Sequence, residues 1–208
     1  MCVIAVSPKG ERQPTEKELY AMWVNNPHGG GYMSVRKNRV EIHKGFLYWE
    51  DFIRSVKAEK FTSADPVVYH FRISTQGGIC EEMTHPFPIT HQLSMMTALD
   101  VVCDVGVAHN GIIPLTTTKE ETEYSDTALF VSKYLSWLVR SPSDILNPNI
   151  KTMIEELGES KFALLNCKGD ISIIGRFFAH SGVLVSNEYY LNDYGFMAKG
   201  GLSRCIGW

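Results

Sequence analysis

The sequence predicts an α+β fold in a single domain that spans residues 1–208. Two pairs of extended segments are joined by short turns, at Lys37-Asn38 and at Lys168-Gly169, which is typical of antiparallel hairpins. Several segments between the hairpins have apolar residues at helical spacing, and no internal repeat or low-complexity linker divides the chain. Hairpins combined with helices in a chain of 208 residues indicate packed layers around a substantial core.

The first third of the chain supplies clear element boundaries. Thr15 followed by Glu18 is a capping box, which predicts a helix over 16–24. Three successive glycines predict a loop over 25–31, because glycine stabilises neither helix nor strand. The remaining elements expected here are strands over 2–7, 32–36, 39–43 and 67–74 and a helix over 46–60.

The rest of the chain alternates irregular and regular segments. Residues 75–92 carry two glycines and two prolines and are expected to be irregular, and 101–108 reads as one strand that turns at 109–111. Ser125 can cap a helix over 126–139, with Leu129, Phe130, Tyr134 and Leu138 facing inward. A helix over 148–157, a hairpin over 161–167 and 170–175 and a strand over 182–186 follow, and no element is predicted from 192 onward.

Composition and charge exclude several classes of protein. The formal net charge of −3 offers no electrostatic footprint for nucleic acid or an anionic membrane. No apolar run approaches the roughly 20 residues that a membrane span needs, and no secretory leader precedes Cys2. The five cysteines are odd in number, widely scattered and without CxxC spacing, which indicates a reducing compartment. We expect a cytoplasmic protein without nucleic-acid or membrane partners.

Cys2, directly behind the initiator methionine, has the chemistry of an N-terminal nucleophile. Removal of Met1 would give Cys2 a thiol and a free α-amine, which titrate near roughly 8.5 and 7.7–8.0 in model compounds. One residue then supplies nucleophile and general base, because the amine can accept the proton of the thiol. The structural alternative is that Cys2 is a small hydrophobe at the start of the buried strand Val3-Ile4-Ala5-Val6.

Three further positions carry polar groups where the chain leaves regular structure. Arg72 lies at a strand end, Asn110-Gly111 at the next turn and Asp126 at a helix start. Each has a structural alternative: a surface or ion-paired arginine, a tight turn, and a carboxylate favoured by the helix dipole.

Together these positions form an ordered set of motifs. They are MC at 1–2, HFRISTQG at 70–77, THPF at 84–87, VAHNGII at 107–113 and SDT at 125–127. The set resembles the class II glutamine amidotransferases of the N-terminal-nucleophile hydrolase superfamily, and the glycine loop at 26–32 resembles that of small stand-alone members. The resemblance implies a four-layer αββα sandwich of two antiparallel sheets between helical layers.

The resemblance also implies a role for each residue. Cys2 would attack the side-chain amide of L-glutamine and form a γ-glutamyl thioester with release of ammonia. Asn110, by its carboxamide, and Gly111, by its N–H, would form the oxyanion hole. Arg72 would bind the substrate α-carboxylate and Asp126 the α-ammonium. Thr75, Gln76 and Gly77 would line the glutamine pocket, and neither a cofactor nor a metal is implied.

The sequence departs from part of that family at two positions. Ile73 and Gln76 stand where the sugar-phosphate synthases have an aromatic residue and a histidine. This departure speaks against their coupling of the glutaminase site to an acceptor domain, while the hydrolytic chemistry needs neither residue. Because 208 residues accommodate one domain and no acceptor-synthase half, we expect ammonia delivery to a synthase partner subunit or simple glutaminase activity.

Other readings remain open at this point. The histidines at 85, 91 and 109 with Cys80 lack the HExxH or i,i+4 spacing of a metal site, and the glycine loop lacks a phosphate-binding pattern. The alternatives to glutamine hydrolysis are an N-terminal-nucleophile amidase for another γ-glutamyl or acyl amide, and a non-catalytic module that retains the fold. Convergence of Arg72 and Asp126 on Cys2 distinguishes glutamine from other amides.

Overall fold

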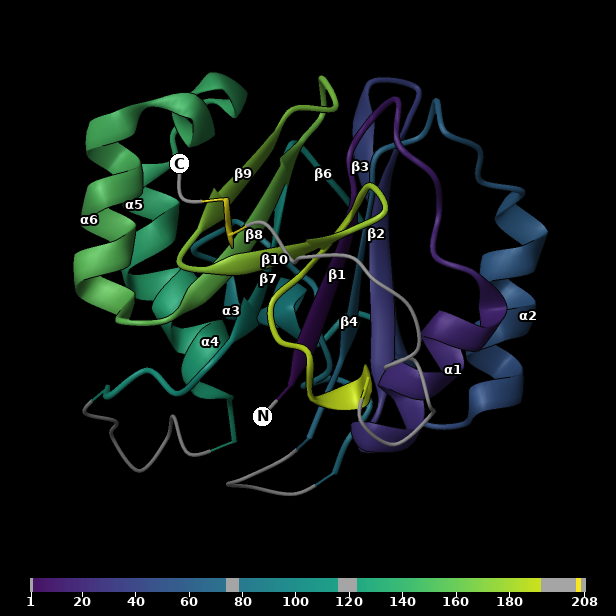
Figure 1. Ribbon diagram of the computed structural model, residues 1–208. Coiled ribbons are helices and arrows are strands. Elements are labelled where there is room, and N and C mark those ends of the chain that lie inside the picture. The colour runs from purple at the N-terminus through teal and green to yellow at the C-terminus, as the bar shows by residue number, and fades with distance from the viewer. Residues whose placement is uncertain (1, 74–78, 116–122, 192–204, 207–208) are drawn as a thin grey trace.

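Two antiparallel sheets packed face to face form the centre of the molecule (Figure 1). The computed structural model describes residues 2–73, 79–115, 123–191 and 205–206. In this part of the chain the larger sheet has the order β12-β10-β11-β1-β4-β2-β3-β6 and the smaller one β5-β7-β8-β9. Helices α1 and α2 cover the outer face of the larger sheet, and α4 to α6 cover the outer face of the smaller one (Figure 1). The predicted α+β fold and its four-layer order are confirmed.

The bounds of the elements are as follows. The strands are β1 Val3–Ser7, β2 Gly30–Arg36, β3 Arg39–Phe46, β4 Val67–Phe71, β5 Phe87–Pro88, β6 Asp100–Cys103, β7 Val105–Asn110, β8 Lys161–Asn166, β9 Ile171–Ile174, β10 Phe177–His180, β11 Val183–Val185 and β12 Cys205–Ile206. The helices are α1 Glu16–Asn25, α2 Trp49–Glu59, α3 Leu93–Met96, α4 Asp126–Phe130, α5 Ser136–Leu138 and α6 Pro148–Gly158. A π-helical turn, η2 (Val131–Leu135), and two 3-10 turns, η3 (Pro142–Leu146) and η4 (Tyr189–Leu191), complete the set.

Strand alternation explains why β1 is apolar throughout. Val3 and Ala5 face α1 and α2, whereas Ile4 and Val6 face the smaller sheet. A strand that is buried on both faces needs no polar alternation, because neither side meets water. The same alternation of side chains places each residue of the strands beside β1 on one or the other face of the larger sheet.

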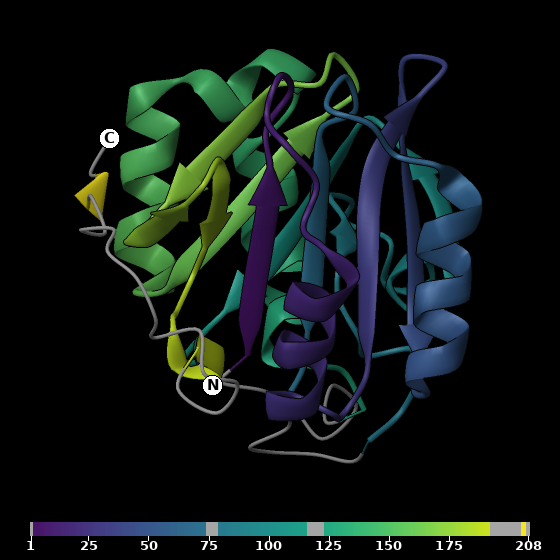
Figure 2. The same ribbon diagram turned by 45° about the vertical axis from the view of Figure 1, so that its right-hand side comes forward.

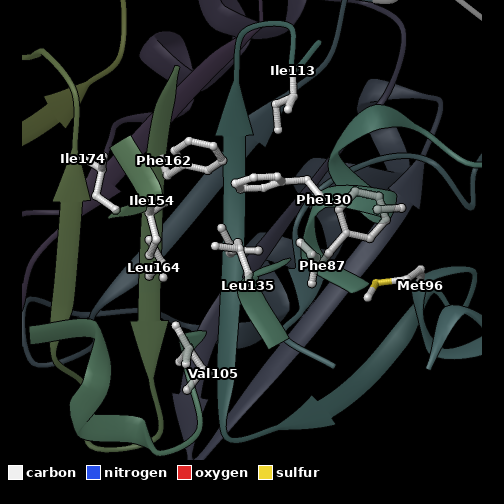
Figure 3. Packing of buried hydrophobic residues seen from close by; sticks show 14 of the residues in the cluster. Phe87, Met96, Val105, Ile113, Phe130, Leu135, Ile154, Phe162, Leu164 and Ile174 are labelled. Carbon is white, nitrogen blue, oxygen red and sulfur yellow. The ribbon is translucent and has the colours of Figure 1, made fainter. Parts of the chain in front are cut away.

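Three hydrophobic cores separate the four layers. One lies between α1–α2 and the larger sheet, a second between the sheets, and a third between the smaller sheet and the helices α4 to α6. Figure 3 shows the third core, where the rings of Phe130 and Phe162 stack with centroids 5.7 Å apart. Burial on this scale holds the strand ends, where the polar motifs lie, in fixed relative positions.

Most predicted boundaries are confirmed by capping and turn geometry. Thr15 Oγ1 accepts the N–H of Glu18 at 3.2 Å, and the Glu18 carboxylate accepts the N–H of Thr15 at 2.7 Å. Lys37 and Asn38 both have positive φ, at 49° and 58°, as the predicted two-residue hairpin turn requires. Ser125 caps α4 by accepting the N–H of Ala128.

Three predictions about the elements were wrong, and several short elements were not predicted. The segment 101–108 is not one strand, because Asp104 separates β6 in the larger sheet from β7 in the smaller, and β7 continues through Asn110. Gly30 and Gly31 belong to β2, where a side chain on Gly31 would overlap the carbonyl oxygen of His85. The second helix begins at Trp49, since residue 46 ends β3. The short elements β5, α3, β10 and β12 were not predicted.

The helix after Ser125 was correctly placed but its inward face was partly wrong. Leu129 and Phe130 are buried as expected, whereas Tyr134 is 40% exposed and Val131 and Leu135 are buried instead. The π-helical turn explains the difference, because its wider spacing rotates the following residues relative to an α-helix.

Candidate functional site

Strand register brings two of the predicted residues to one end of the larger sheet. β1 and β4 are antiparallel neighbours in which Val3 lies opposite Phe71 and Ile4 opposite His70. Cys2 and Arg72 are the next residues outward on these strands. Because side chains alternate along a strand, Cys2 follows Ile4 and Arg72 follows His70 on the face toward the smaller sheet. The start of β1 lies at the lower edge of the molecule beside η4 in both views (Figures 1 and 2).

The half-buried Cys2 is held mainly through the backbone. Its Sγ–H donates to the carbonyl oxygen of Ile73 over 3.7 Å, and its own carbonyl accepts the side-chain N–H of Asn187 at 2.5 Å. Burial raises the pKa of the Cys2 thiol above its ordinary value, and the positive charge of Arg72 offsets part of this effect. The thiol is therefore neutral near pH 7, and a base must remove its proton before it can act as a nucleophile.

Arg72 is fixed by the glycine-containing loop that precedes β2. Its N–H donates to the carbonyl of Gly29 at 2.8 Å, and its carbonyl accepts the N–H of His28 at 3.0 Å. The residue is 8% exposed. The loop therefore holds the backbone of Arg72 in place. The prediction of a loop over 25–31 did not include this role.

Asn110 reaches the same space from the smaller sheet. Ala108 faces the core between the sheets, so Asn110, two residues further along β7, faces the same way. Its Nδ2–H donates to Ser186 Oγ at 2.8 Å, and Ser186 Oγ also accepts the N–H of Ile4 at 2.9 Å. A single hydroxyl group thus connects the strand that carries Cys2 with the side chain of Asn110.

Gly111 follows Asn110 where only glycine fits. It has φ of 156°, and a Cβ at this position would overlap Ser160 Oγ. Ser160 Oγ–H donates to the carbonyl of Asn110 at 3.1 Å and also contacts His109 Nε2 at 2.8 Å. Ser160, the residue before β8, therefore clamps the backbone of Asn110-Gly111.

Three buried histidines lie behind these residues. His70 Nε2 donates to the carbonyl of His109 at 2.9 Å and so bridges the two sheets, and the ring of His85 lies 4.2 Å from that of His70 between centroids. Burial is the main cause that lowers the pKa of His70 to about 3 and that of His109 to about 4, and it holds that of His85 well below its ordinary value. All three are neutral near pH 7, so none adds a positive charge beside Arg72.

Asp126 anchors the segment that leaves Gly111. Its two carboxylate oxygens accept the N–H groups of Ile113 at 2.8 Å and of Thr127 at 2.7 Å. Thr127 Oγ1 in turn contacts His109 Nδ1 at 2.8 Å. Oδ1 of Asp126 also accepts the Thr127 hydroxyl at 3.3 Å. Asp126 is thus tied to the chain on either side of the Asn110 turn, which agrees with the structural alternative for this residue and leaves the second lone pair of Oδ2 for a ligand.

The predicted residues differ in how directly the structure connects them. Cys2 and Arg72 lie at adjacent strand ends, and Asn110 joins them through Ser186 and Ile4. Asp126 connects to this group only through the segment around Gly111 and through Thr127 and His109. Thr75, Gln76 and Gly77 lie outside the described residues.

Ser186 and Asn187 were missed by the sequence analysis. They follow β11, which pairs with β1 so that Ala5 lies opposite Val185. No local pattern marks them, because a Ser-Asn pair after a short strand is common in turns. Only the pairing of the two chain-distant strands reveals that they meet Cys2 and Ile4.

Other features of the described part of the chain do not join this group. No set of three His, Cys, Asp or Glu side chains is placed there to hold a metal ion, and no helix there is long and apolar enough to cross a bilayer. An open pocket of about 800 Å³ lies between α1 and α2, and Tyr20, Trp23 and Trp49 contribute to its lining.

No family model matches the sequence, and no curated protein matches it. Among solved structures, the chain is similar to a glutamine phosphoribosylpyrophosphate (PRPP) amidotransferase from B. subtilis, complexed with ADP and GMP, with 14% sequence identity and a TM-score of 0.49. The match covers 99% of this chain and 44% of that protein, so this chain spans less than half of the other's length.

Proposed function

We propose that residues 1–208 form one glutamine amidotransferase domain, which hydrolyses the side-chain amide of L-glutamine to glutamate and ammonia. The observation that carries the proposal is the placement of Cys2 and Arg72 at adjacent strand ends, with Asn110 linked to the strand of Cys2 through the Ser186 hydroxyl. The motifs containing these residues also occur in the order expected of class II glutamine amidotransferases. A buried arginine beside a thiol and a carboxamide suits a substrate that carries both a carboxylate and an amide.

The first chemical step requires removal of Met1, so that the α-amine of Cys2 is free. The amine takes the thiol proton, and the sulfur attacks the amide carbon, whose carbonyl electrons move to oxygen. Because burial raises the pKa of the thiol, this internal base is needed near neutral pH. The tetrahedral intermediate then collapses: the carbon–nitrogen bond breaks, the ammonium proton passes to the leaving nitrogen, and ammonia departs.

The second step releases glutamate. A water molecule gives a proton to the same amine and its oxygen attacks the thioester, which breaks the carbon–sulfur bond and returns the thiol. In both steps negative charge develops on the former carbonyl oxygen. The Asn110 carboxamide and the Gly111 N–H are the donors proposed for that oxygen. Ser186 holds the carboxamide and Ser160 holds the backbone of this segment before the substrate arrives.

Substrate recognition is assigned to charged groups at the two sides of the site. Arg72 pairs with the α-carboxylate of glutamine, and Asp126 accepts the α-ammonium with the remaining lone pair of Oδ2. Opposite charges at a fixed separation select a free amino acid over a peptide-bound amide. Thr75, Gln76 and Gly77 complete the pocket in this proposal, and the ammonia passes to an acceptor on a partner protein.

The test combines intact mass with a product assay. The purified protein is expected to lack Met1 and to release equal amounts of glutamate and ammonia from L-glutamine, with much slower turnover of asparagine and of glutamine inside a peptide. Retention of methionine on the active protein would overturn the mechanism. Turnover of a different γ-glutamyl amide instead would favour the broader amidase, and an alkylatable Cys2 without any amide turnover would favour a non-catalytic module.

A further inference from the structure

Ser186, which follows β11, is fixed on every side. Its side chain is fully buried. Its N–H donates to the carbonyl of Ile4 at 2.9 Å, and its own carbonyl accepts Lys161 Nζ at 2.5 Å. Its hydroxyl oxygen accepts both the N–H of Ile4 and the Nδ2–H of Asn110. The position of this oxygen is therefore set by three strands, β1, β8 and β11, before Asn110 contacts it.

The carboxamide of Asn110 has few other constraints. The residue is 3% exposed, and its Oδ1 is a buried acceptor that contacts no donor in the described part of the chain. A carboxamide is planar, so fixing one of its two N–H groups on Ser186 also fixes the direction of the second. Without the hydroxyl, rotation about the bonds of the side chain would spread that second N–H over several orientations.

We propose that Ser186 is a positioning residue that aims the Asn110 carboxamide at the oxyanion. The inference rests on the proposed function, in which Asn110 is an oxyanion donor. Ser186 touches neither substrate nor the reacting atoms and acts through Asn110. Because the same hydroxyl holds the N–H of Ile4, it also keeps the strand that carries the nucleophile at a constant distance from the donor.

The kinetic test is a double-mutant cycle. Ser186→Ala is expected to lower kcat about 10-fold and leave KM unchanged, since the loss of one orienting hydrogen bond affects the transition state and spares ground-state binding. In an Asn110→Ala background the same substitution is expected to lower kcat no further. The control is Ser7→Ala, which removes a buried hydroxyl at the other end of β1 that has no hydrogen-bond partner among the described residues. Equal losses in both backgrounds would overturn the positioning role.

A readout that does not use turnover separates this inference from the proposed function. In NMR spectra, the Asn110 side-chain amide protons, assigned through Asn110→Ala, are expected to be inequivalent and exchange-protected in the wild type. Ser186→Ala should make them exchange like a solvent-exposed amide, while thermal unfolding checks that the fold is retained. Unchanged Asn110 signals would overturn the inference even if the enzyme is active. If the wild type releases no ammonia but the signals change as described, the positioning stands and the proposed function fails.

Discussion

The start of β1 carries the proposed nucleophile, and the end of β7 carries the groups proposed to stabilise the oxyanion. The two regions differ in how firmly their groups are held. At β1 the Cys2 side chain makes one long contact, from Sγ to the Ile73 carbonyl at 3.7 Å. At β7 the segment from His109 to Gly111 is held by Thr127, Ser160 and Ser186 through contacts of 2.8 to 3.1 Å. The thiol is loosely held, while the groups proposed to stabilise the oxyanion are rigidly held.

This difference matches what each region must do. A nucleophile changes bonding partner twice in a cycle and needs rotational freedom about its own side chain. Oxyanion donors are effective only when they are oriented before charge develops, because reorienting them during the reaction costs free energy. Removal of Cys2 should therefore affect chemistry and spare stability, whereas changes around β7 should affect both.

The largest effect is expected for Cys2→Ala. Glutaminase turnover should fall by at least about 10³-fold, because in the proposed mechanism the Cys2 thiol is the group that forms the thioester. The free energy of unfolding, from urea denaturation, should change by less than about 1 kcal/mol, since the side chain makes a single long contact. Cys167→Ala, at another half-buried free cysteine, is the matched control and should retain full turnover. Comparable activity in the two variants would remove the nucleophile assignment.

Asn110→Ala tests the donor at the end of β7. We expect kcat to fall by about 10²–10³ with little change in KM, because the carboxamide acts on the transition state. The matched control is Asn26→Ala, another buried asparagine, whose Nδ2 donates to the carbonyl of Met22 at the end of α1. That variant should lose stability without a loss of kcat per folded molecule. An Asn110→Ala effect limited to KM would make this residue a binding group.

Gly111→Ala tests the rigidity of the same segment. The new Cβ would overlap Ser160 Oγ, so a loss of roughly 2–3 kcal/mol in unfolding free energy is expected. Ser160→Gly should relieve this loss, which would make the double variant more stable than the sum of the single changes predicts. Gly169→Ala, at φ of 88° with its nearest neighbour at 3.4 Å, should cost about 1 kcal/mol by backbone strain alone. Strict additivity of Gly111→Ala and Ser160→Gly would contradict the clamp.

The buried histidines predict a smaller effect that depends on pH. Below the ordinary histidine pKa of about 6.5 the unfolded chain takes up protons, while folded His70 and His109 stay neutral down to about pH 3 and 4. The unfolded state then binds more protons, so the unfolding free energy should fall as the pH is lowered from 6.5 toward 4 and be insensitive to these groups above 6.5.

His85→Leu removes one of the protons that the unfolded chain takes up at the buried histidines. Both ring nitrogens of His85 are buried without a partner among the described residues, so leucine removes the titration and breaks no hydrogen bond. The slope of unfolding free energy against pH between 4 and 6.5 should decrease by up to about 1.4 kcal/mol per pH unit. Chemical denaturation across this range measures the slope, and an unchanged slope would show that His85 does not titrate on unfolding.

Local signals in the sequence predicted most of the elements. Thr15 with Glu18 and the Lys37-Asn38 turn depend on neighbours within three residues, so their geometry can be inferred without knowledge of the fold. The division at Asp104 could not be inferred in this way. The apolar pattern continues across it, and only the packing of two separate sheets determines that the chain changes sheet there.

The candidate site was predictable only in part. The chemistry of Cys2, Arg72 and Asn110 is visible in their motifs, because reactive and charged side chains occur where strands end. Ser186 and Asn187 lie more than 180 residues from Cys2 and Ile4, and their contacts arise from the pairing of β11 with β1. These supporting contacts depend on which strands pair in the sheet. No short pattern in a single sequence encodes that pairing.

A single residue, Asp104, connects β7 to the strand of the other sheet, so a rotation at this residue would be magnified at the far end of β7. β7 runs from this residue to Asn110, a span of about 20 Å at the usual rise per residue. A rotation of only about 5° at Asp104 would displace the far end by about 2 Å, which exceeds the misplacement that costs an enzyme 100-fold in rate. The pairing of β7 with β8 along its whole length and the hydrogen bond from His70 to the carbonyl of His109, near the far end, both oppose such a rotation.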